Sequence, residues 1–179
     1  NSRAFCGKED CRHVSISLAG SKPITIHNLY VPSGGDEPDP GINEKFAHKL
    51  KFIDELESWF AKGSVPKGQE GVVVGDLNIA PLEHDVWSHK DLLKVVSHTP
   101  VETQGLLRVM KAGNWVDLMR QHTPASEKLY TWWSYRAKDW ALANRGRRLD
   151  HIWSTPGLSP ACKDITILRE TRGWTQTSD

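Results

Sequence analysis

Residues 71–78 read GVVVGDLN, a short apolar run that ends in a carboxylate and a carboxamide. Three consecutive valines between two glycines are typical of a buried strand, because β-branched side chains pack well in a sheet. Asp76 and Asn78 are two residues apart, so their side chains point the same way if the extended geometry continues. The stretch therefore predicts a central strand that delivers two polar groups to the rim of a sheet.

An antiparallel hairpin and a helix are predicted before this strand. Residues 13–18 and 24–31 alternate apolar and polar side chains around a Gly-Ser-Lys-Pro turn, which is the pattern of a hairpin. The apolar residues between Asn43 and Gly63 fall on one face of a helix. Asn43 is its expected N-cap, and Gly63 is expected to end it.

A second helix and further strands are predicted after it. Thr99 and Glu102 have the spacing of a capping box, and the helix they open should run to Gly113. Residues 81–98 are polar and show no period, which favours a long surface segment. Three more strands are expected at 130–135, 148–154 and 164–169.

This order of elements favours one α/β domain of the α+β type over residues 1–179. Strands, helix, strand, helix and strands follow one another without regular βαβ alternation, which indicates mixed or antiparallel sheets flanked by helices. A hydrophobic content of 38% and a charged content of 25% are typical of a soluble globular protein, and no apolar stretch is long enough to span a membrane. The net charge of +1 does not itself indicate a nucleic-acid binder. Three cysteines, an odd number, are consistent with a reducing, cytoplasmic location.

Polar groups at two strand ends are the first candidates for chemistry. Asp76 could orient or deprotonate a water molecule, and Asn78 could hydrogen-bond that water or a phosphate oxygen. The alternative for both is a turn that leaves the strand. Tyr30 lies where the strand at 24–31 runs into a loop and could present its hydroxyl to a phosphate, although taken by itself the residue favours a tyrosine packed by its ring at the rim.

Aromatic and basic side chains alternate between residues 130 and 153. Arginine and lysine neutralise phosphates while aromatic rings contact sugars and bases, so this mixture suits a nucleic-acid surface. The alternative is a solvated basic face over a tryptophan-rich core. Asp150 lies in an otherwise apolar strand and requires a partner, which could be Arg148, His151 or a catalytic histidine that it orients. The candidate DNA-binding residues are Trp132, Arg136, Lys138, Arg145 and Arg147.

In this order the motifs resemble those of exonuclease III-type apurinic/apyrimidinic (AP) endonucleases, of the endonuclease/exonuclease/phosphatase superfamily. Residues 30–34 match Tyr-x-Pro-x-Gly, and residues 75–78 match Gly-Asp-hydrophobic-Asn. Residues 132–136 match Trp-x-x-Tyr-Arg, and residues 144–150 match Asn-Arg-Gly-x-Arg-hydrophobic-Asp. Ser178 and Asp179 match the start of a Ser-Asp-His motif. The family's early Asn and metal-binding Glu motifs, and the His after Asp179, are not in this sequence, which therefore resembles part of a longer enzyme.

The resemblance implies a deoxyribonuclease I-like four-layer sandwich, incomplete in this chain, and a DNA-repair activity. It implies Mg²⁺-dependent hydrolysis (Mn²⁺ is possible) of the phosphodiester 5′ to an abasic site, and 3′-to-5′ exonuclease action, by a monomer on duplex DNA. Tyr30, Asp76, Asn78 and Asp150 would be catalytic, Asp76 and Asp179 would lie on the metal side, and the chain alone would be inactive. Two alternatives stay open: another phosphodiesterase or phosphatase of the superfamily, and a non-catalytic DNA-binding fragment.

Overall fold

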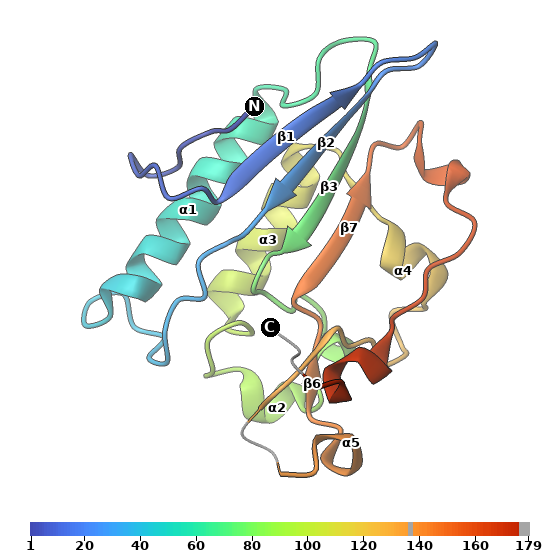
Figure 1. Cartoon of the computed structure of the whole chain (residues 1–179). Helices are drawn as coiled ribbons and strands as arrows, with labels where there is room; N and C mark the ends of the chain where they lie inside the picture. Colours follow the sequence, from blue (N-terminus) through green and yellow to red (C-terminus); the bar gives the residue numbers. More distant parts are fainter. Residues whose placement is uncertain (136–137, 176–179) are drawn as a thin grey trace.

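The computed structural model describes residues 1–135 and 138–175, and its centre is a five-stranded mixed sheet (Figure 1). The strand order is β1-β2-β3-β7-β4, in which only the β2–β3 pair is parallel. The predicted hairpin and the predicted central strand are both confirmed. The strands are β1 His13–Leu18, β2 Ile24–Leu29, β3 Glu70–Asp76, β4 Val116–Asp117 and β7 Asp150–Ser154.

Two long helices cover one face of this sheet (Figure 1). Helix α1 spans Glu44–Ala61 and begins as predicted, because the side chain of Asn43 accepts hydrogen bonds from the first-turn amides. Helix α3 spans Pro100–Ala112 and starts at the capping box of Thr99 and Glu102. Mixed sheets flanked by helices are therefore confirmed as the fold class.

The main core lies between these helices and the sheet. Strand residues of one parity, such as Leu29, Val73 and Trp153, point toward the helices and are almost fully buried. The predicted apolar face of α1 meets them with Ile53 and Leu56. Burial of this apolar surface is the main stabilising contribution to the fold.

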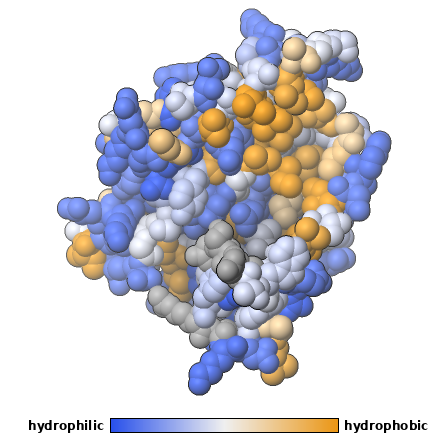
Figure 2. Space-filling view, viewed as in Figure 1, coloured by the Kyte–Doolittle hydropathy of each residue, from blue (hydrophilic) through white to orange (hydrophobic). Residues whose placement is uncertain are grey.

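The opposite face of the sheet carries exposed apolar side chains. Val14, Ile16 and Leu18 of β1 are each about half exposed, at 49%, 54% and 48%. Strand register places Ile16 beside Ile26, and Ile26 beside Val72, so the apolar stripe continues across three strands. Figure 2 shows it as a hydrophobic area over this part of the sheet, as expected for a sandwich that is incomplete in this chain.

The prediction of a surface segment at residues 81–98 is wrong. The segment contains the 3₁₀ turn η1 Glu83–Asp85 and the short helix α2 His89–Leu92, and Val86 and Leu92 form a second small core with Ala80. Asp85 is fully buried and is paired with Arg148. The prediction relied on the periodicity of apolar residues. Periodicity does not detect a segment that is buried through ion-paired side chains and one-turn helices.

The C-terminal third has short elements. A two-stranded ribbon is formed by β5 Trp132–Trp133 and β6 Gly146–Arg147. Strand β5 is shorter than the strand predicted at 130–135. The strand predicted at 164–169 is wrong: those residues pair with no strand and run in irregular backbone into a 3₁₀ turn. No helix among the described residues is both long and apolar enough to cross a membrane. The remaining elements are α4 Leu118–His122, α5 Trp140–Ala143, η2 Ser159–Ala161 and η3 Arg169–Gly173.

Candidate active site at the sheet edge

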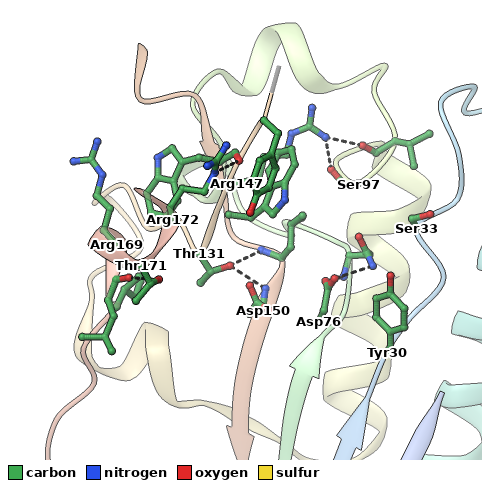
Figure 3. Close-up of a pocket in the computed structure, with 18 of the residues that line it drawn as sticks. Tyr30, Ser33, Asp76, Ser97, Thr131, Arg147, Asp150, Arg169, Thr171 and Arg172 are labelled. Atoms are coloured by element: carbon green, nitrogen blue, oxygen red, sulfur yellow. Dashed lines mark hydrogen bonds between the residues drawn. The ribbon is translucent and has the colours of Figure 1, made fainter. Parts of the chain in front are cut away.

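A cleft of about 770 Å³ opens where β3 ends and β7 begins (Figure 3). Asp76 and Asp150 lie on its sheet side, and Tyr30 lies beside them at the end of β2. Arg147 and Trp132 of the two-stranded ribbon line the other side. The structure therefore brings together residues from three separate sequence motifs.

The turn after β3 fixes the first carboxylate. Gly75 has a φ of +133°, and a Cβ there would collide with the backbone of Leu29, so only glycine fits before Asp76. Asn78 has a φ of 52°, and its backbone amide donates to Asp76 Oδ1 at 2.8 Å. Its side-chain amide donates to Asp76 Oδ2 at 3.1 Å and to the carbonyl of Val31 at 2.9 Å. Both Nδ2 protons are thus used inside the protein, which leaves Oδ1 of Asn78 as an acceptor.

Asp76 is a carboxylate with an unusual affinity for protons. Burial, together with the nearby charge of Asp150, raises the pKa of Asp76 from 3.8 to about 6, while the hydrogen bonds from Asn78 oppose the rise. At neutral pH the group is mostly ionised yet basic enough to take a proton, which is the property of a general base.

Asp150 lies beside Asp76 on the neighbouring strand. The two residues are register partners in the antiparallel β3–β7 pair, so their side chains project from the same face. Burial raises the pKa of Asp150, and a hydrogen bond with Thr131 opposes that rise. Two neighbouring carboxylates that each resist ionisation are suited to a cation or to a shared proton.

Neither Arg148 nor His151 is the partner of Asp150. Arg148 is fully buried and binds Asp85 and Asp117, at 2.9 Å and 2.7 Å. His151 is buried on the helix side of β7, where its Nε2 lies 2.9 Å from the carbonyl oxygen of Ile79. Of the alternatives left by the sequence, only a histidine oriented by Asp150 stays open, and its expected position after Asp179 lies outside the described residues.

Tyr30 projects into solvent at the cleft. Its side chain is exposed, and the guanidinium of Arg12 lies 5.2 Å from its ring centroid. The ring is therefore not a packed rim side chain, and its hydroxyl is accessible to a ligand in the cleft.

Arg147 is the basic candidate that lines the cleft. Its Nη1 donates to the carbonyl of Val96 at 3.1 Å and to Ser97 Oγ at 2.8 Å (Figure 3), and the guanidinium lies 5.8 Å from the ring centre of Trp132. Among the described residues, no carboxylate lies within 4.0 Å of this guanidinium. A half-buried guanidinium with no carboxylate in direct contact is a ready site for a phosphate.

Two other basic candidates lie outside the cleft lining. Arg145 is exposed, with its guanidinium 4.8 Å from the ring centroid of Trp87, and Lys138 is also exposed. Arg136 and Asp179 fall outside the described residues, so the predictions for them stay predictions.

Arg169 and Arg172 were missed by the sequence reasoning. Both line the cleft opposite Asp76 (Figure 3). Both also lie over the ring of Trp140, at 5.4 Å from its centroid. Arg172 also lies 3.4 Å from the ring centroid of Tyr135. Two arginines three residues apart were the available signal, and the wrong strand assignment at 164–169 concealed the first of them.

Comparisons with known proteins show the family of this chain. Residues 5–179 match the endonuclease/exonuclease/phosphatase family. The chain belongs to that family.

Its relatives include members of the exonuclease III branch, which confirms the resemblance seen in the motifs. Exodeoxyribonuclease III of Haemophilus influenzae is 29% identical over 162 residues, which are 87% of this chain and 58% of that protein. An AP endonuclease from Archaeoglobus fulgidus superposes with a TM-score of 0.79 at 29% identity, covering 91% of this chain and 60% of the other. A 3′ phosphatase from Neisseria, bound to a product DNA hairpin, gives 0.83 at 25% identity, covering 97% and 63%. The chain therefore spans about three-fifths of the length of these relatives.

Proposed function

We propose that the protein containing this chain is a DNA-repair nuclease that hydrolyses phosphodiester bonds in duplex DNA, 5′ to abasic sites and at 3′ ends. The observation that carries the proposal is the pair of register-matched carboxylates, Asp76 and Asp150, in a cleft whose other wall holds Arg147. Relatives named exodeoxyribonuclease III, AP endonuclease and 3′ phosphatase support the choice of substrate.

Asp76 is the proposed general base. Its raised pKa lets it accept a proton from water at neutral pH, and the two hydrogen bonds from Asn78 fix the direction of its lone pairs. Asn78 Oδ1 can accept from the same water, which would align it for in-line attack on phosphorus. Tyr30 would contact the phosphate through its hydroxyl, and Asp150 would orient a histidine beyond the described residues.

The donor set fits a hard divalent cation. Asp76 and Asp150 are neighbours on adjacent strands and both have raised pKa values, so a Mg²⁺ or Mn²⁺ ion held by Asp76 would stabilise the ionised forms of both carboxylates. When bound, such an ion neutralises charge on the phosphoryl oxygens. Within residues 1–135 and 138–175, no group of three His, Cys, Asp or Glu side chains forms a complete metal cluster. Asp76 and Asp179 are the residues that we propose to hold the ion.

The basic and aromatic wall favours a nucleic acid over a lipid phosphate. A guanidinium beside an indole, as in Arg147 and Trp132, suits a sugar–phosphate backbone next to an extruded sugar. A phosphoinositide phosphatase or sphingomyelinase on the same fold remains the second candidate because it needs the same carboxylates.

The test is a direct comparison of substrates with the natural protein that contains this chain. We expect incision of a duplex with one abasic site and removal of a 3′-terminal phosphate, both abolished by EDTA and restored by Mg²⁺. Vesicles containing a phosphoinositide or sphingomyelin should not be turned over. Lipid turnover without DNA cleavage would overturn the proposal in favour of the second candidate.

A further inference from the structure

A lysine and a glutamate are buried together where α1 meets α3, next to segments that line the cleft. The side chains of Lys49 and Glu102 are fully shielded from solvent, and Nζ lies 2.6 Å from Oε1. Moving two charges out of water is costly, and a well-packed apolar pair of similar volume is often as stable or more stable. Helix packing alone therefore does not explain why charges occupy this position.

Lys49 holds two backbone segments of the cleft. Its ammonium group donates to the carbonyl of Asn78 at 2.8 Å and to the carbonyl of Ser33 at 3.1 Å. With Glu102 as the third acceptor, all three of its protons have partners. Ser33 and Asn78 both line the cleft, so one buried cation fixes the loop after β2 and the turn after β3.

Glu102 holds a third segment. Both of its carboxylate oxygens accept from the backbone amide of Ser97 at 3.0 Å, and the carboxylate also accepts from the amide and hydroxyl of Thr99. Ser97 has a φ of 86°, a conformation that a residue with a side chain rarely adopts. Its hydroxyl accepts from Arg147 at 2.8 Å, so the carboxylate also supports the basic wall of the cleft.

We propose that Lys49 and Glu102 act as a pair of positioning residues, which fix the Asp76–Asn78 turn and the Ser97–Arg147 contact relative to each other. Neither side chain lines the cleft, so the pair acts through the groups that it binds. An apolar pair of equal volume could pack α1 against α3, but it could not hydrogen-bond the carbonyl of Asn78 or the amide of Ser97. The catalytic consequence rests on the nuclease function proposed above.

The decisive variant replaces both charges together. Lys49→Met and Glu102→Leu alone should each lower the melting temperature, because each leaves a buried charge unpaired. The double variant should regain the part of that loss that comes from the unpaired charge, but not the part that comes from the backbone groups of Ser33, Asn78, Ser97 and Thr99, which lose their partners. Its kcat on abasic duplex DNA should stay down on the order of 10²-fold, the effect of a misplaced catalytic group. Its KM should change far less than its kcat.

A matched control exists on the same two helices. Arg108 of α3 pairs with Glu57 of α1 at 3.1 Å on the exposed side, away from the cleft. The double variant Arg108→Met with Glu57→Leu removes an ion pair between the same helices and should keep the wild-type kcat. Positioning, rather than loss of a helix–helix ion pair, is what separates the two double variants.

Hydrogen exchange gives a readout that does not depend on turnover. The amide of Asn78 is bonded to Asp76 Oδ1 and not to the buried pair, so its exchange reports whether the turn has loosened. We expect faster exchange at Asn78 in the Lys49/Glu102 double variant, with no change at Val73 in the core of β3. If that variant does not fold, Glu102→Gln, which keeps the volume and removes the charge, carries the same measurements.

The outcomes separate the two proposals. Wild-type exchange at Asn78, or a kcat equal to that of the Arg108/Glu57 control, would overturn the positioning role. Absence of DNA cleavage by the natural protein would overturn the nuclease function, and exchange at Asn78 would then decide the positioning role alone.

Discussion

At the scale of single residues, the Asp76–Asn78 turn shows how a short motif defines a chemical role. Both donors of the Asn78 carboxamide are used by Asp76 and Val31, so this side chain orients the Asp76 carboxylate and has no proton left for a phosphate. From the sequence, Asp76 and Asn78 were expected to point the same way, with a turn as the alternative, and the bond from the Asn78 amide to Asp76 Oδ1 shows the turn. The sequence could not decide between water and phosphate as the partner of Asn78, because that depends on which atoms the fold has already used.

Replacing Asp76 by asparagine should nearly abolish cleavage while leaving DNA binding largely in place. The loss should be on the order of 10²–10⁴-fold in kcat, the range for a positioned proton-transfer group. Steady-state cleavage of an abasic duplex and a filter-binding assay measure the two effects. Asp139→Asn, on an exposed cap of α5, is the control. Near-normal cleavage by Asp76→Asn would show that Asp76 only closes a turn.

At the scale of elements, strands and helices with clear period were predictable, and the segments that complete the cleft were not. The hairpin, β3, α1 and α3 follow from alternation and capping residues, whose causes are local. The 81–98 segment is buried through the Asp85–Arg148 ion pair, which joins residues 63 positions apart. The strand wrongly expected at 164–169 failed for the same reason: whether an alternating segment finds a neighbouring strand is decided by the tertiary structure.

The ribbon that carries Arg147 should contact the DNA backbone. Arg147→Ala removes a guanidinium that has no carboxylate partner among the described residues, so it should weaken binding to all duplexes alike. If the contact is to one phosphate, the salt slope of log K should fall by about one unit. Titrations at several salt concentrations measure this slope. The control is Arg3→Ala, because the guanidinium of Arg3 already pairs with Glu55. An unchanged affinity and slope would make Arg147 a structural support of the 96–97 loop only.

At the scale of the whole molecule, buried histidines couple stability to pH. His13 and His27 stack in the core with 3.0 Å between ring nitrogens, and burial, helped by the charge of His27, lowers the pKa of His13 from 6.5 to about 4. Burial likewise lowers the pKa of His151 to about 4. The folded state thus favours neutral rings, and their stabilising contribution is complete only above the unfolded pKa of about 6.5.

The free energy of unfolding should therefore fall between pH 6.5 and pH 4. Over this window the unfolded chain binds histidine protons that the folded chain excludes, and each such histidine contributes a slope of up to about 1.4 kcal/mol per pH unit. The raised pKa values of Asp76 and Asp150 act in the opposite direction, but the histidines with lowered pKa values outnumber them, so the net change is a loss of stability. Urea unfolding at several pH values measures the slope. His13→Gln should lower stability at pH 7 but flatten the dependence, whereas the exposed His122→Gln should leave it unchanged. An equally steep slope in His13→Gln would place the acid sensitivity elsewhere.

The open face of the sheet should dominate the solution behaviour of residues 1–179. An apolar stripe that runs through Ile16, Ile26 and Val72 is the kind of surface that binds hydrophobic dyes or a second molecule. We expect this polypeptide to bind the dye ANS and to self-associate with rising concentration. Ile16→Lys should reduce both effects, because it places a charge in the centre of the stripe. Ile42→Lys makes the same substitution at an isolated residue that is 75% exposed, and it should change neither. Equal dye binding by the two variants would mean that the stripe is covered in solution.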